Sequence, residues 1–242
     1  MSELSAKDKV FYDELWKEWD DMHYHSPAPR IRRERIISML KKAPFKSLLD
    51  VGCGNGEFLK EVRDNIRNIS LAGADISQLA IESNCKRFND MRFYQLNLNE
   101  ETLPEKFDVV TSMEVIEHCS DYTESIKRLS EMTRGRLIIT VPCGPVFPID
   151  RIVGHTKHFT VKEIQHAIEK AGLRVISIQR WGFPFFNLYK HAINVSPEKT
   201  MESFMSEKPY TWKHKLLSHA VHAAFKLCLP QGGYQLFAEA HR

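Results

Sequence analysis

An apolar run followed by a glycine-rich turn occupies residues 48–58, which read Leu48-Leu49-Asp50-Val51-Gly52-Cys53-Gly54-Asn55-Gly56-Glu57-Phe58. The run predicts a buried strand, and the amphipathic segment after the turn predicts a helix. Glycine is needed where the backbone adopts positive φ or where it approaches a ligand without a Cβ in the way. Because open α/β sheets bind ligands at the carboxyl ends of their strands, this turn predicts a ligand site.

The glycine spacing argues against two common nucleotide-binding loops. A dinucleotide fingerprint of the form Gly-x-Gly-x-x-Gly would require glycine at position 57, where the chain has Glu57. A phosphate-binding loop would require Gly-Lys-Ser/Thr after the turn, and that sequence is absent. The turn instead follows an acidic residue, Asp50, which suits a ligand that carries an ammonium group.

Short apolar runs alternate with amphipathic segments from about residue 45 to 182, which is typical of a parallel sheet with crossover helices. A capping box at Thr160-Val-Lys-Glu163 predicts one helix start, and Gly135 predicts the end of the helix before it. The expected strands cover residues 46–51, 69–75, 91–96, 107–112, 136–141 and 173–181, with a last strand in 233–242.

Two segments fall outside this alternation. Residues 1–44 predict a helical leader, rich in aromatic and basic side chains, and residues 183–231 predict a helical insertion before the final strand at 232–242. An insertion beside a completed sheet is where substrate specificity usually resides. We therefore expect a cofactor-binding core at 45–182 with two attached lid elements.

These residues resemble the class I S-adenosylmethionine (SAM)-dependent methyltransferases, whose first motif is an acidic residue followed by Gly-x-Gly-x-Gly. The resemblance covers about residues 45–182 and the last strand. The stretch from Met113 to His118, Met-Glu-Val-Ile-Glu-His, is similar to the Glu-Val-x-Glu-His stretch of ubiquinone-biosynthesis-like O-methyltransferases. The resemblance implies an α/β, Rossmann-like sheet of seven strands flanked by helices, with six strands parallel and the last antiparallel.

The resemblance also implies SAM as cofactor and assigns residues to it. Asp50 and the turn residues Gly52, Cys53, Gly54 and Gly56 would hold the methionine portion. Asp75 would accept hydrogen bonds from the ribose hydroxyls, as an acidic residue does in dinucleotide sites. The adenine would lie against Ile76, Asn97 and Leu98, with Met113 as the floor; Asn97 departs from the acidic residue that family members often carry there.

Histidines are the candidate catalytic residues, because imidazole is a suitable base where a hydroxyl must lose its proton. His155 and His158 are the first candidates and His118 the second; an acceptor that is already anionic needs no base. Small-RNA 2′-O-methyltransferases use a similar set to hold a metal. We expect no metal, but a metal site stays open as the alternative. Its ligands would be Glu114, Glu117, His118, His155 and His158.

The expected reaction moves a methyl group to an oxygen of a small hydrophobic or aromatic metabolite. Arg30 or Arg33 would pair with the cofactor's carboxylate or with an anionic substrate. The other expected acceptor and lid residues are Glu117, Phe185, Tyr189 and Trp212. Two alternatives remain open: a metal-dependent RNA 2′-O-methyltransferase, and a non-catalytic SAM-binding or membrane-associated partner protein.

The composition indicates which partners and which cellular compartment to expect. Thirty-four basic against 31 acidic residues give a net charge of +3, which argues against a general nucleic-acid binder. The five scattered cysteines favour a location in the reducing cytoplasm. The sequence has no apolar run of about 18 residues, so no membrane-spanning helix is expected. Residues 212–229 are amphipathic and basic, so they predict either packing against the sheet or peripheral contact with anionic lipid. No oligomeric state follows from the sequence.

Overall fold

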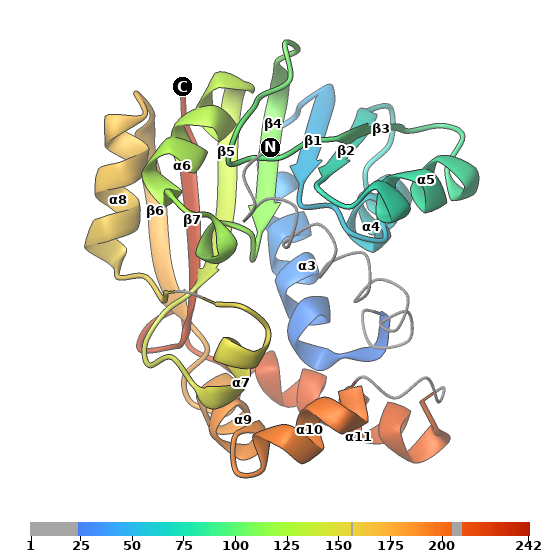
Figure 1. The fold of residues 1–242 in the computed structure, drawn as a ribbon, viewed down its shortest axis with the longest axis vertical. Helices are drawn as coiled ribbons and strands as arrows, with labels where there is room; N and C mark the ends of the chain where they lie inside the picture. Colours follow the sequence, from blue (N-terminus) through green and yellow to red (C-terminus); the bar gives the residue numbers. More distant parts are fainter. Residues whose placement is uncertain (1–23, 156, 205–209) are drawn as a thin grey trace.

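A seven-stranded sheet in the order β3-β2-β1-β4-β5-β7-β6 forms the centre of the computed structural model, which describes residues 24–155, 157–204 and 210–242 (Figure 1). Strand β7 pairs antiparallel with both β5 and β6, and the other pairings are parallel. The predicted fold class is therefore confirmed. The strands are β1 Ser47–Val51, β2 Ser70–Asp75, β3 Arg92–Gln95, β4 Phe107–Met113, β5 Thr133–Pro142, β6 Arg174–Trp181 and β7 Gln235–His241.

Helices cover both faces of this sheet and gather beyond the carboxyl ends of its strands (Figure 1). The part of the predicted leader at residues 1–23 lies outside the described residues. The described helices are α3 Pro27–Leu40, α4 Glu57–Asn65, α5 Gln78–Arg87, the 3-10 helix η1 Ile116–His118, α6 Tyr122–Glu131, α7 Pro148–Ile152, α8 Val161–Lys170, α9 Phe185–Ile193, α10 Pro197–Phe204 and α11 Trp212–Phe225. No described helix combines the length and the apolarity needed to cross a bilayer.

Alternate residues of the central strands enter two separate hydrophobic cores. In β1, Leu49 packs in the core that contains α6 and α8, whereas Leu48 packs in the core that contains α3, α4 and α5. This alternation follows from the two-residue period of a strand. The sheet is therefore buried on both faces, and its exposed functional edge is the one where the strands end.

The helix before Gly135 ends upstream of that residue, as predicted, but Gly135 is not its cap. Helix α6 ends at Glu131, and Gly135 lies inside β5, which starts at Thr133. A Cβ on Gly135 would approach the carbonyl oxygen of Asp108 to 2.8 Å, at a bulge in the β4–β5 pairing. Glycine is required there for close approach of two backbones rather than for a helix cap.

The capping box at the start of α8 is confirmed. The hydroxyl of Thr160 accepts a hydrogen bond from the backbone N–H of Glu163 at 3.3 Å, and the Glu163 carboxylate accepts one from the backbone N–H of Thr160 at 2.9 Å. These bonds begin α8 directly after the segment that carries His155 and His158.

A buried arginine fixes the leader helix to the sheet. Arg136 of β5 donates to the Glu239 carboxylate of β7 at 2.7 and 2.9 Å, and also to the carbonyl oxygen of Met39 at 2.8 Å. The last carbonyls of a helix lack intrahelical partners, so this guanidinium satisfies one of them at the end of α3. The position of α3 therefore depends on Arg136.

Replacing Arg136 with methionine should lower the free energy of unfolding by about 3–5 kcal/mol, because Glu239 would remain buried without its cation. Urea denaturation monitored by circular dichroism measures this change. The matched control is Arg134→Met, which breaks an ion pair whose arginine side chain is 65% exposed and should change the free energy by less than about 0.5 kcal/mol. Equal losses in the two variants would contradict the role given to Arg136.

Candidate functional site

The glycine turn after β1 has a backbone that other residues would strain. Gly52, Gly54 and Gly56 have φ values of +80°, +51° and +77°. A Cβ on Gly52 would also lie 2.2 Å from Cγ2 of Val115, which is closer than any real contact. Gly56 then serves as the N-cap of α4. The turn therefore keeps its backbone open toward the carboxyl end of β1.

Asp75 holds this turn in place from the end of β2. Its carboxylate accepts hydrogen bonds from the backbone N–H of Gly54 at 2.8 Å and of Ser77 at 2.9 Å. The side-chain amide of Asn84 donates to the carbonyl oxygen of Gly54 at 2.7 Å. The residue expected to bind ribose therefore also fixes the turn that precedes α4.

Asp50 is buried with half of its carboxylate unsatisfied. It is 1% exposed, and Oδ1 accepts a hydrogen bond from the hydroxyl of Thr111 at 2.7 Å. Oδ2 has no hydrogen-bond partner among the described residues. Burial raises the pKa of Asp50 to about 7, with the negative charge of Asp75 adding to the rise and the Thr111 bond opposing it. A ligand with an ammonium group fits this oxygen, because it would supply the missing donor and charge.

One cavity of about 400 Å³ joins Asp50 and the glycine turn to the loops after β4 and β5. This volume lies within the range of small-molecule sites. Of the residues expected to bind the cofactor, Gly56 alone is outside the lining; those that line the cavity are Asp50, Gly52, Cys53, Gly54, Asp75, Ile76, Asn97, Leu98 and Met113. The structure therefore brings nearly the whole predicted cofactor set together.

Asn97 has a hydrogen bond of its own within this wall. Its side-chain oxygen accepts from the backbone N–H of Asn99 at 3.1 Å. An amide oxygen has two lone pairs, so it can accept a second bond from a ligand amino group. The expected adenine contact remains a prediction.

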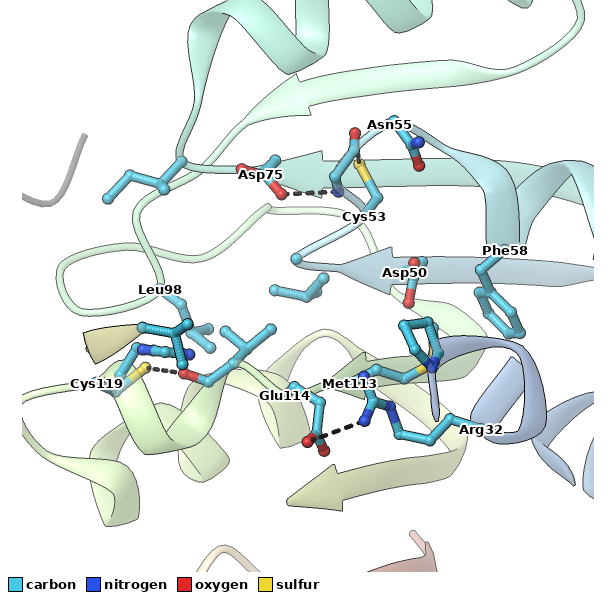
Figure 2. A pocket seen from close by; sticks show the side chains of 18 of the residues that line it. Arg32, Asp50, Cys53, Asn55, Phe58, Asp75, Leu98, Met113, Glu114 and Cys119 are labelled. Atoms are coloured by element: carbon cyan, nitrogen blue, oxygen red, sulfur yellow. Dashed lines mark hydrogen bonds and ion pairs between the residues drawn. The ribbon is translucent and has the colours of Figure 1, made fainter. Parts of the chain in front are cut away.

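The far half of the cavity is lined by charged and polar side chains. Arg32 and Glu114 face each other there, with Nη1 and Oε2 3.4 Å apart (Figure 2). The other Glu114 oxygen accepts from Thr140 Oγ1 at 3.0 Å and from Gln235 Nε2 at 2.7 Å. Glu114 has a φ of +55°, a strained conformation that a non-glycine residue keeps only where its surroundings fix it. These three partners fix it here.

Arg32 was missed in the sequence, where Arg30 and Arg33 were the candidates. Arg33 lines the cavity and donates to Glu61 at 2.9 Å, whereas Arg30 is outside the lining and lies 3.4 Å from His219. The signal was helical spacing: Pro29, Arg32 and Arg33 are three and four residues apart, so they share one face of α3.

His118 lines the cavity with a defined tautomer. Its Nδ1 lies 3.2 Å from the carbonyl oxygen of Gly154. A carbonyl oxygen only accepts, so Nδ1 carries the hydrogen and Nε2 carries the lone pair of the neutral ring. This imidazole can therefore accept a proton at Nε2.

His155 also lines the cavity, but its surroundings keep it neutral. Burial lowers the pKa of His155 to about 2, and the neighbouring His118 and Lys190 add to this effect. A ring that resists protonation to this extent is a poor proton acceptor. His118 can therefore act as a proton acceptor and His155 cannot, although the two rings are in edge-to-face contact at 4.9 Å between their centres.

His158 lies behind His155, outside the cavity lining. Its Nε2 is 3.3 Å from Nδ1 of His155 and 3.4 Å from Oδ2 of Asp150. Burial lowers the pKa of His158, and the negative charge of Asp150 opposes the change. Asp150 also binds Lys190 of α9, so this cluster joins the insertion to the site.

Among the residues that the structure describes, two groups of three side chains have the geometry to hold a metal ion: Glu117 with His118 and His155, and Asp150 with His155 and His158. In each group the ligand atoms lie within 4.8 Å of one another. Glu114 belongs to neither. Burial, followed by the charge of Glu114, raises the pKa of Glu117 well above its usual range, so a metal there would have to displace a proton.

The aromatic residues expected to surround the acceptor lie elsewhere. Phe185, Tyr189 and Trp212 are all outside the described lining of the cavity. Tyr189 packs on Phe225 at 5.4 Å between ring centres, and Trp212 is 70% exposed. The insertion reaches the cavity instead through Lys190, which no sequence pattern indicated.

Comparison with known proteins agrees with the predicted family. A family model for the methyltransferase domain matches residues 23–178. A ubiquinone biosynthesis O-methyltransferase of Aeromonas salmonicida is 25% identical over 216 residues, which cover 78% of this chain and 90% of that protein. A small RNA 2′-O-methyltransferase of Schizosaccharomyces pombe is 30% identical over 114 residues, 40% of this chain and 30% of that protein.

The fold is also found in solved structures. The magnesium protoporphyrin IX methyltransferase of Synechocystis PCC 6803, with bound SAM, superposes with a TM-score of 0.54 at 16% identity, covering 92% of this chain and 82% of the other. The family match spans well over half of the present chain. The chain therefore belongs to the methyltransferase domain family and is a class I SAM-dependent methyltransferase.

Proposed function

We propose that this chain transfers the methyl group of SAM to a hydroxyl oxygen of a small polar metabolite. The observation that carries the proposal is the single cavity that joins the unsatisfied oxygen of Asp50 to the imidazole of His118. One end has the chemistry to bind the cofactor and the other end has a base. The O-methyltransferase relative supports oxygen as the acceptor atom.

In this proposal the cofactor-binding half works by charge and backbone shape. Oδ2 of Asp50 accepts from the ammonium group, and the carboxylate of Asp75 accepts from the ribose hydroxyls. Ile76 and Leu98 contact the adenine, and Gly52 permits the close approach of the ligand. When bound, SAM supplies a methyl group on a positively charged sulfur.

The acceptor half removes a proton and aligns the hydroxyl. Nε2 of His118 takes the hydroxyl proton, while Gly154 keeps the ring in the required tautomer. His155, held neutral, orients the acceptor by hydrogen bonding. The Arg32–Glu114 pair fixes part of the cavity lining, and alignment with exclusion of water contributes the rest of the rate.

The lining indicates a polar acceptor in place of the aromatic one expected from the sequence. Phe58 is the one phenyl, phenol or indole ring in the described lining, and it lies on α4 beside the glycine turn. The far half contains the side chains of Arg32, His118, Asp150, His155 and Lys190. Hydroxyl, carboxyl or phosphate groups on the acceptor would match these partners.

Metal-dependent methylation of an RNA 2′-hydroxyl is the second candidate. It is favoured by the geometry of Glu117, His118 and His155, and by the similarity to a small RNA 2′-O-methyltransferase. The same His118 would then be a metal ligand rather than a base. The two candidates thus make opposite predictions about added metal.

The affinity for SAM should depend on pH through Asp50. As pH falls below about 7, protonation removes the charge that attracts the ammonium group, so affinity should fall by up to about tenfold per pH unit. Titration calorimetry with SAM from about pH 5.5 to 7.5 measures this, below the range in which an α-amino group loses its own proton. Asp50→Asn should bind weakly with little pH dependence. Asp75→Asn should bind weakly but keep a pH dependence, displaced to lower pH because the charge of Asp75 helps to raise the pKa of Asp50. A wild-type affinity that is constant over this range would contradict the assignment of Asp50.

Replacing His118 with glutamine should lower the rate of methyl transfer by about 10²–10⁴-fold, because the base is lost. The assay follows the methyl group of labelled SAM into the small molecules of a cell extract, and calorimetry confirms that SAM still binds. His166→Gln is the matched control and should retain full activity, since this histidine is exposed on α8 and lies outside the cavity lining. Full activity in His118→Gln would exclude the base role.

Removal of divalent metal should leave the transfer to small metabolites unchanged. Protein treated with a chelator and dialysed is assayed with labelled SAM on two acceptors, a metabolite extract and short RNA with a free 3′-terminal 2′-hydroxyl. Activity on RNA that is lost on chelation and restored by Mn²⁺ would instead establish the second candidate. Glu117→Gln separates the two further, because only metal-dependent activity requires that carboxylate to be ionised.

A further inference from the structure

Helix α11 exposes an apolar stripe to solvent. Trp212, Leu216 and Leu227 follow one another at spacings of four and eleven residues, which places them on one side of the helix and its C-terminal extension. They are 70%, 63% and 68% exposed, and the adjacent Leu217 is 65% exposed. We call these four residues the α11 face. Isolated exposed leucines are ordinary, but an aligned set with a tryptophan indicates an interaction site.

The opposite side of α11 already has its packing partners. Phe225 is buried against Trp181 and Tyr189, and Ser218 and His222 are also buried. The helix packs against α3 and α9 through this side. One side of α11 therefore packs on the core beside the sheet, as the packing interpretation of the sequence predicts, and the α11 face is the opposite, exposed side.

The residues near the α11 face in the sequence include several lysines and no acidic side chain. Lys213 and Lys215 lie between its residues, and Lys226 follows the helix. No aspartate or glutamate occurs from residue 208 to 238. The one carboxylate near them in the described structure is Glu34 of α3, which pairs with Lys226 at 3.4 Å and with His222 at 3.0 Å. Lys213 and Lys215 have no carboxylate partner among the described residues, and Lys213 lies over the ring of Trp212 at 5.7 Å from its centre.

The combination of exposed apolar side chains and lysines favours some binding partners of the α11 face over others. A second copy of the chain would bring lysines against lysines with no carboxylate to pair them, which disfavours self-association. An anionic lipid surface complements both the apolar side chains and the lysines. The acyl chains would contact the apolar side chains, and the lipid phosphates would pair with the lysines. With 14 residues, α11 is about 21 Å long, too short to cross a bilayer but suited to lying in its interface.

We propose that the α11 face docks this protein on anionic lipid membranes. Tryptophan is favoured at the boundary between headgroups and acyl chains, which is where Trp212 would lie at the start of the helix. Helix α11 packs on α3, and α3 carries the Pro29, Arg32 and Arg33 that line the cavity. In Figure 1, α11 lies beyond the carboxyl ends of the strands, and α3 extends from the face of the sheet toward it. Docking through α11 would therefore bring the cavity close to the membrane. The proposal is independent of the methyl acceptor.

Vesicle co-sedimentation of the full chain tests this proposal. The vesicles contain phosphatidylcholine alone or with phosphatidylglycerol, at low and at high salt. We expect binding to the anionic vesicles at low salt, with weakening by salt. Replacing both Lys213 and Lys215 with glutamine should reduce the partition coefficient by about 30-fold, from the contribution of each cation near such a surface. Replacing Leu216 and Leu217 with serine should reduce it by at least about tenfold.

Matched variants control for folding and for nonspecific charge. Ile176→Ser alters an apolar residue of β6 that is 50% exposed, and Lys170→Gln alters an exposed cation of α8. Both should bind vesicles as the wild type does, and SAM affinity by calorimetry should be equal in all variants. Failure to bind anionic vesicles, or equal binding by the α11 variants, would overturn the proposal. So would a dimer in solution that the Leu216 and Leu217 replacements dissociate, since that result assigns the face to a second copy.

Discussion

The buried carboxylate of Asp50 is the constraint on which the site depends. It is the penultimate residue of β1 and lies in the interior, where Thr111 satisfies one oxygen and no described residue satisfies the other. An unsatisfied buried carboxylate is unfavourable, so it is retained where a ligand completes it. Burial raises the pKa of this group to about 7, and an ammonium group beside it would favour the charged carboxylate. The three glycines after it keep the approach to this oxygen free of side chains.

The sheet order brings the rest of the site to that oxygen. Between β1 and β4 the direction in which strands are added reverses, so the loops that follow these two strands diverge and leave a crevice. The turn after β1 forms one wall, and the segment that carries Glu114 and His118 forms the other. Arg136 fixes α3 across this opening, and α3 in turn places Arg32 against Glu114. Stability of the sheet and geometry of the cavity thus share one set of contacts.

The sequence was informative where local chemistry determines structure. The glycine turn, Asp75 and the capping box at Thr160 each depend on neighbours within a short stretch, and the predicted strands were placed to within three residues. Gly135 was misread, because its need for glycine arises from Asp108 on another strand. Arg32 and Lys190 were missed for the same reason: their partners, Glu114 and Asp150, are far away in sequence. The expected aromatic side chains lie outside the cavity lining because Tyr189 packs on Phe225 and Trp212 is exposed to solvent, and neither contact can be read from apolar density alone.

Differences in burial give the three histidines different roles, whereas the sequence identified all three as candidates for the same role. All three carry the same ring, yet His155 is kept neutral by its surroundings, and His158 is placed behind it beside Asp150. His118 alone combines a place in the cavity wall with a carbonyl that sets its tautomer. The same cluster is nearly a metal site, and the high pKa of the Glu117 carboxyl is what opposes a cation there. In the two candidate functions His118 therefore has different roles: a base while Glu117 keeps its proton, and a metal ligand once a cation has displaced that proton.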